Sequence, residues 1–141
     1  MDTSKTQRHK LIKNLMGRHA EKVSEASITL WELLAIQITS IVGEGGFNSL
    51  FTRSVLLTQT SFSWLEVNPL ALLTANRFTT LKRCFDGQTP AYTKAANSQL
   101  LITFTDILAS LVGEQITTTI LHSAWGNDVS DESDMEKKHE Q

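Results

Sequence analysis

Apolar residues recur along this chain at spacings of three and four, and no stretch alternates cleanly between apolar and polar positions. The first spacing is typical of helices that bury one stripe, whereas alternation would indicate strands. Only two prolines, Pro69 and Pro90, interrupt the pattern. The pattern therefore predicts an all-α fold.

Capping residues divide the pattern into separate helices. Ser27 can cap a helix that ends at Gly43, and Asn68 with Pro69 is a typical helix start. A basic amphipathic helix is expected at about residues 5–21, ahead of four main helices that form an irregular bundle. The four main helices are predicted over about residues 28–42, 47–60, 69–86 and 90–125.

The second and last of the five predicted helices are the most apolar, so we place them at the centre of the bundle. Trp31 lies on the same face as Leu34 and Ile38 and is expected in the core. Gly113 falls inside the predicted helix over 90–125. We expect that helix to run unbroken through residues 115 and 116, with Gly113 as a crossing point or kink.

Charge divides the chain into three regions. Residues 1–22 hold six Lys or Arg against two acidic residues, and residues 127–141 hold six Asp or Glu against two Lys. We interpret residues 1–22 as a basic N-terminal helical arm in solvent, residues 23–126 as the helical-bundle domain, and residues 127–141 as a disordered acidic tail. The tail has too few apolar groups to offset the entropy of ordering it.

Composition bounds the cellular setting. The 141 residues carry a formal net charge of −2 and one cysteine, Cys84, so neither an internal disulfide nor a cysteine-based zinc site is expected. No signal segment and no apolar run of about eighteen residues is recognised. We predict a cytoplasmic protein that does not span a membrane.

An internal similarity appears when the sequence is shifted by half its length. Residues 40–44 then fall on residues 110–114, and both read Ser, Ile or Leu, Val, Gly, Glu. Apolar character also matches at other positions. A duplication and a chance match of apolar helices both account for this similarity. The further aligned pairs are Leu30 with Leu100, Trp31 with Leu101, Leu34 with Phe104, Ile38 with Leu108, Leu50 with Ile120 and Phe51 with Leu121.

Two glutamates, Glu44 and Glu114, directly follow Gly43 and Gly113. A buried carboxylate needs a partner, and Arg53, Arg77 or His122 can supply one, whereas a carboxylate at an exposed edge needs none. The candidate polar cluster therefore consists of Glu44, Arg53, Glu114 and His122.

Enzyme chemistry finds little support. The glycine-rich turn at 43–46 lacks the sixth-position glycine of a dinucleotide fingerprint and the lysine of a P-loop. No Glu-x-x-His pair for a helical metal site and no serine-centred elbow is present. We expect Cys84 to be a packed thiol. The chain is predicted to be no enzyme, with no catalytic residue, no cofactor and no metal.

Two other roles, nucleic-acid binding and histidine phosphotransfer, each have some support in the sequence. Cations at Arg77, Lys82 and Arg83 interleave with an apolar stripe, so nucleic-acid binding is not expected. Histidine phosphotransfer domains are helical bundles of this size, and His9 followed by Lys13 resembles part of their motif at a different spacing. Phosphorelay-type signalling therefore stays an alternative.

The remaining hypothesis is a noncatalytic helical adaptor or regulatory module that binds protein. A small-ligand sensor with a cavity near the tryptophans is a further alternative. Because the second and last helices are apolar over more of their circumference than a small bundle can cover, we expect a homodimer. The candidate interface residues are Leu33, Ile36, Ile102 and Ile107.

Overall fold

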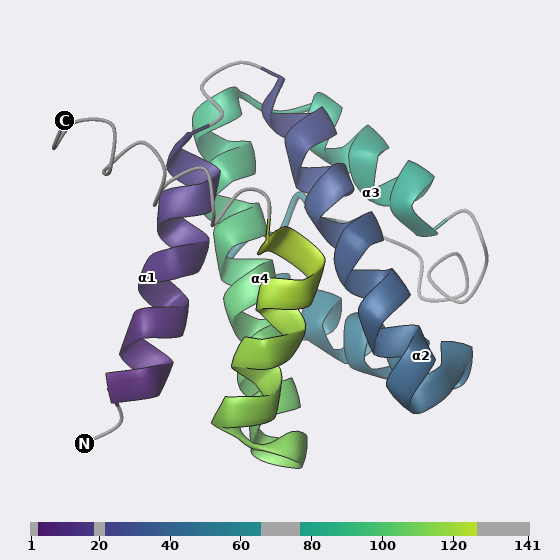
Figure 1. Cartoon of the computed structure of the whole chain (residues 1–141). Helices are drawn as coiled ribbons and strands as arrows, with labels where there is room; N and C mark the ends of the chain where they lie inside the picture. The colour runs from purple at the N-terminus through teal and green to yellow at the C-terminus, as the bar shows by residue number, and fades with distance from the viewer. Residues whose placement is uncertain (1–2, 19–21, 66–76, 127–141) are drawn as a thin grey trace, which may run out of the picture.

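The computed structural model describes residues 3–18, 22–65 and 77–126, and within these residues the regular structure is helical and contains no strand (Figure 1). The predicted all-α class is confirmed. The predicted tail over 127–141 and the first residues of the helix predicted over 69–86 lie outside the described residues.

The helices follow the predicted order, with shifted bounds. They are α1 (Thr3–Gly17), α2 (Val23–Thr58), α3 (Arg77–Asp86) and α4 (Pro90–Val112), followed by a helix over 114–126. Thr89 caps α4, because its side chain accepts a hydrogen bond from the backbone N–H of Tyr92.

The two longest helices, α2 and α4, pack against each other at the centre of the molecule. On one side α1 packs on α4, and on the other α3 packs on α2 (Figure 1). The prediction that the most apolar helices are central is therefore correct. Their packing joins buried side chains from every described helix into a single hydrophobic core.

Aromatic rings fill the middle of this core. Trp31 is fully buried, and its ring meets Phe51 at 4.9 Å and Phe104 at 5.2 Å between centroids, both edge to face. The indole N–H donates to Asn97 Oδ1 at 2.7 Å, which satisfies its polar group. Trp125 donates in the same way to the Leu30 carbonyl oxygen at 2.9 Å.

Both long helical stretches turn sharply at a glycine. Gly43 has φ 81° and ψ 170°, and Gly113 has φ 94° and ψ 157°. Only glycine adopts this region readily, since a Cβ clashes with the backbone there. The single helix predicted over 90–125 is divided in two at Gly113, which confirms the kink expected there, and residues 115 and 116 are helical as predicted. At Gly43 the break is confined to one residue instead of the predicted four-residue turn.

The N-terminal helix is part of the core. Ile12, Leu15 and Met16 are buried, and so is Arg8. The interpretation of residues 1–22 as a solvated arm is therefore wrong for α1, because its apolar stripe has a complementary surface on α4. In contrast to Arg8, the α1 lysines Lys10 and Lys13 are exposed.

Within the described residues, α2 and α4 are long and apolar enough to cross a membrane, judged by length and composition alone. Both helices bury one face in the core described above. The core helix of a globular protein passes the same test of length and composition.

The stability of the protein should depend on glycine at position 43, where φ is positive. We expect Gly43→Ala to lower the free energy of unfolding by about 1–3 kcal/mol, because alanine is strained at this φ and ψ. Gly45→Ala is the matched control: Gly45 is helical with open space around it, so alanine there should stabilise the protein by about 0.5–1 kcal/mol. Urea unfolding followed by circular dichroism measures both, and equal stabilities would contradict the role given to Gly43.

Replacing Trp31 with alanine should remove the centre of the aromatic cluster. We expect a loss of about 3–5 kcal/mol in the free energy of unfolding, the usual cost of deleting a buried aromatic side chain. Tyr92→Ala, at an exposed position, is the control and should change stability little. A Trp31→Ala protein as stable as the wild type would show that the side chain is not packed in the core.

Candidate functional site

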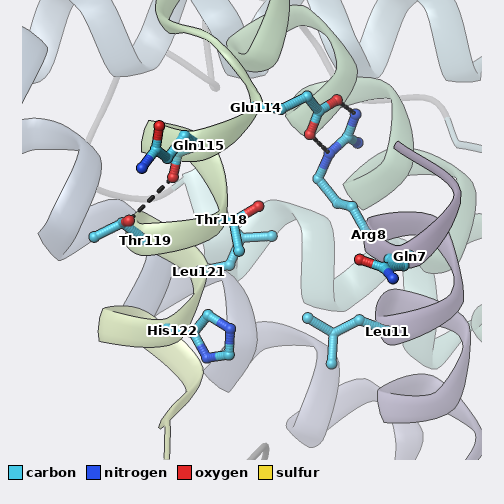
Figure 2. Close-up of a pocket in the computed structure, with 9 residues that line it drawn as sticks. All are labelled: Gln7, Arg8, Leu11, Glu114, Gln115, Thr118, Thr119, Leu121 and His122. Atoms are coloured by element: carbon cyan, nitrogen blue, oxygen red, sulfur yellow. Dashed lines mark hydrogen bonds and ion pairs between the residues drawn. The ribbon is translucent and has the colours of Figure 1, made fainter. Parts of the chain in front are cut away.

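A hollow of about 690 Å³ lies between α1 and the helix over 114–126 (Figure 2). Helix α1 contributes Gln7, Arg8 and Leu11 to its wall. Figure 2 shows Leu11 and His122 on opposite sides of the hollow. A bidentate ion pair between Arg8 and Glu114 lies at one end. The residues supplied by the other helix are Glu114, Gln115, Thr118, Thr119, Leu121 and His122.

The Arg8 guanidinium closes this end of the hollow. It meets the Glu114 carboxylate side on, with Nη2 donating to Oε1 at 2.7 Å and Nε to Oε2 at 3.1 Å. Nη1 donates to Thr105 Oγ1 at 2.8 Å and to Asp106 Oδ1 at 2.7 Å. A paired, bidentate guanidinium of this kind compensates for the loss of hydration that its burial imposes.

Asp106 joins two α1 side chains to α4. Its Oδ1 also lies 2.7 Å from His9 Nε2. Burial raises the pKa of Asp106, but the hydrogen bonds from His9 and Arg8, together with their positive charge, outweigh burial and hold the pKa below its usual value. The carboxylate is therefore ionised at neutral pH and attaches α1 to α4.

Helical spacing explains why Arg8 is directed inward. Arg8, Ile12 and Met16 follow at intervals of four, so they occupy one face of α1, and all three are buried. Glu114 is brought opposite by the turn at Gly113, which starts a new helix at residue 114. The site thus depends on the kink and on the docking of α1.

The arrangement suits a neutral, partly apolar ligand better than an anion. Two carboxylates already neutralise Arg8, so little positive potential is left for a phosphate or carboxylate ligand. The walls offer amide and hydroxyl groups from Gln7 and Thr118, and an apolar surface from Leu11. Within the described residues, no group of three or more His, Cys, Asp or Glu side chains is placed to hold a metal ion.

The candidate polar cluster does not converge. Glu44 pairs with Arg77, whose Nη1 donates to Oε1 at 2.9 Å, whereas Glu114 pairs with Arg8. His122 shares the hollow with Glu114, and Arg53 lines a separate apolar hollow with Leu56 and Leu57. The prediction of a single cluster is therefore wrong, although Arg77 was one of the partners considered for a glutamate.

Arg77 is held differently from Arg8. Its guanidinium carbon lies 4.8 Å from the ring centroids of both Phe47 and Phe78, whose planes are 77° apart, so the charge lies against two aromatic rings. Its Nε is buried, and no hydrogen-bond partner for it lies within residues 3–18, 22–65 and 77–126. Glu44 is largely exposed, so this ion pair is better hydrated than the one at Arg8.

The four candidate interface residues divide into two groups. Leu33 and Ile36 are exposed on α2, as predicted, with Ile36 at 63%. Ile102 is buried, and Ile107 is half-buried against the core, so the prediction that they face a partner is wrong. The reason is that the chain covers this side of α4 itself.

Sequence reasoning missed Arg8, Asp106 and His9 as a linked group. The available signal was the placement of Arg8 four residues before Ile12, on the apolar stripe of an otherwise basic helix. A cation within an apolar stripe indicates a buried partner, but nothing local shows that the partners lie about 100 residues further along the chain.

Comparison with protein-family models, with curated proteins and with solved structures found no match to this chain.

Removing the Arg8 guanidinium should destabilise the protein. We expect Arg8→Met to lower the free energy of unfolding by about 2–3 kcal/mol, because Glu114 and Asp106 would keep their partly buried charges without a partner. Lys13→Met is the control, since Lys13 is exposed on the same helix. Chemical unfolding measures both variants, and equal effects would refute a specific role for Arg8.

Acid should weaken the attachment of α1. The pKa of Asp106 is lowered in the folded state, so its ionisation stabilises the protein above the ordinary carboxyl pKa, and this contribution is lost as the pH falls through the folded-state value. Between about pH 5 and pH 2, the wild type should lose more stability than Asp106→Asn. Urea unfolding at a series of pH values gives this difference, and parallel profiles for the two proteins would contradict it.

Proposed function

We propose that this chain is a noncatalytic cytoplasmic interaction module, an irregular helical bundle that binds protein through the exposed face of α2. The supporting observation is the exposure of Leu33 and Ile36 on a helix whose opposite face completes the core. Large aliphatic side chains exposed together are typical of a contact surface.

The partner we propose is a second copy of the chain. The α2 stripe consists of Thr29, Leu33, Ile36 and Ser40, spaced at three and four residues, and none of them is charged. A two-fold interface brings the same patch against itself, so an uncharged stripe pairs without like-charge repulsion. A homodimer through this stripe revises the predicted interface, which included Ile102 and Ile107.

Light scattering after size exclusion tests this proposal. Wild-type protein should show twice the 15.7 kDa chain mass at high concentration and dissociate on dilution. Ile36→Lys should give a folded monomer, because the interface would then hold two opposed and desolvated ammonium groups.

The matched control is Leu111→Lys, because Leu111 is as exposed as Ile36 but lies outside the stripe. This variant should remain dimeric. A wild type that is monomeric at every concentration, or an equal response to both lysine substitutions, would reject the α2 stripe as a dimer interface.

A second candidate function is binding of a small neutral ligand in the hollow beside Arg8. The volume of the hollow, about 690 Å³, and its mixed amide and apolar lining favour this. It replaces the predicted sensor site near the tryptophans, since Trp31 and Trp125 are packed and hydrogen-bonded in the core. Thermal-shift screening of neutral amphiphiles against the wild type and Leu11→Lys tests this proposal. Compounds that raise the melting temperature of the variant as much as that of the wild type would reject this site.

The phosphorelay alternative is disfavoured by the contact of His9 Nε2 with Asp106. A phosphoryl group on that nitrogen would lie against a carboxylate and meet electrostatic repulsion.

A further inference from the structure

The two glycine turns lie 70 residues apart and share one geometry. Gly43 and Gly113 differ by 13° in both φ and ψ, in a backbone region that few residues enter. Each follows a long apolar helix, precedes a shorter helix, and is followed directly by a glutamate. In Figure 1, α2 and α4 descend side by side, so both turns lie toward the same end of the molecule.

Burial repeats with the same period. Every buried residue from Val23 to Val55, except Ile28, has a buried residue 70 positions later. The match continues on both sides of the glycines, from Val23 and Thr93 before them to Val55 and Trp125 after them. Chance similarity between apolar helices would not keep one register across a break in the helix.

The first helices correspond as well, with a shift of 69. The buried residues of α3 are Arg77, Leu81 and Phe85, and those at the same spacing in α1 are Arg8, Ile12 and Met16. The shift changes by one between the first and second helices, because seven positions separate Met16 from Val23 whereas eight separate Phe85 from Thr93. Each helix therefore presents an arginine and two apolar residues to its partner.

The contacts between these elements are reciprocal. Arg8 of the first helix binds Glu114 behind the second glycine, and Arg77 of the third helix binds Glu44 behind the first glycine. Likewise α1 packs on α4 and α3 packs on α2. This crossed pattern is what a two-fold axis between α2 and α4 would generate.

We infer that the chain is a duplicated helical unit, over residues 3–58 and 77–126 of the part that the structure describes, folded as an internal two-fold dimer. Each copy docks its first helix on the long helix of the other copy and secures it with an arginine to the glutamate behind the kink. This inference does not depend on the proposed function.

The internal symmetry explains an otherwise isolated polar atom. Ser27 Oγ is buried and has no hydrogen-bond partner among the residues that the structure describes, whereas its counterpart Asn97 accepts the Trp31 indole N–H. The counterpart of Trp31 is Leu101, which has no donor to offer Ser27. Of these two equivalent sites, the one at Asn97 is hydrogen-bonded in the described structure and the one at Ser27 is not.

The copies also differ at the surface. Asp106, held by Arg8 and His9, corresponds to Ile36, which is exposed. One copy therefore uses this position to dock a helix within the chain, whereas the other presents an aliphatic group to solvent.

An exchange of core residues between copies tests the inference. The exchange variant moves the Trp–Asn pair and its aromatic neighbour to the equivalent positions of the other copy. Because these sites are equivalent under the two-fold axis, it should unfold cooperatively, and one indole N–H should be protected from solvent exchange by NMR. Its substitutions are Trp31→Leu, Leu101→Trp, Leu34→Phe, Phe104→Leu, Ser27→Asn and Asn97→Ser.

The control is a shuffle that keeps the same residues at the four apolar positions but ignores the symmetry: Trp31→Leu, Leu34→Trp, Leu101→Phe and Phe104→Leu. Its thermal midpoint should lie below that of the exchange variant. An exchange variant that fails to fold, or melts no higher than the shuffle, overturns the inference. So do wild-type NMR contacts that place Ile12 against α2 or Leu81 against α4.

Discussion

The architecture depends on one backbone constraint, the left-handed turn that glycine allows at residues 43 and 113. A helix that ran straight through either position would carry its second segment away from the core. The turn at Gly43 returns Phe47 and Phe51 to the ring cluster around Trp31, and the turn at Gly113 returns Trp125 to the Leu30 carbonyl. Chain reversal by a single residue lets a short chain cover both faces of its central helix pair.

Electrostatics then determines how the outer helices attach. Each glutamate behind a glycine is held by an arginine from a helix that is remote in sequence, and the two pairs have different surroundings. Arg8 is enclosed by carboxylates and a hydroxyl, whereas Arg77 lies against two aromatic rings and pairs with an exposed glutamate. The charges of the Arg8 pair are less exposed to water than those of the Arg77 pair. Their attraction is therefore screened less.

These attachments separate structural from surface roles along the chain. The charged residues of α1 that face inward attach this helix to the rest of the protein. Arg8, one of these residues, also forms a polar wall of the hollow. The aliphatic residues that the core does not use lie mainly on α2 and beside the glycine turns, at Ile36, Ile41 and Leu111. We therefore place the proposed contact surface on α2 and keep the hollow beside Arg8 as the ligand candidate.

The sequence alone determined the helical class, the central position of the two most apolar helices, the burial of Trp31 and the importance of the two glycines. These features depend on local spacing and on backbone preference, which neighbouring residues specify. The 70-residue similarity was visible too, although sequence alone left it open to chance. Only the tertiary structure decided that α1 is part of the core and that Ile102 is covered. It alone also showed that Arg8 forms an ion pair with Glu114, and Arg77 with Glu44. Such pairings join residues far apart in the chain, and a side chain's local sequence does not specify which distant surface will cover it.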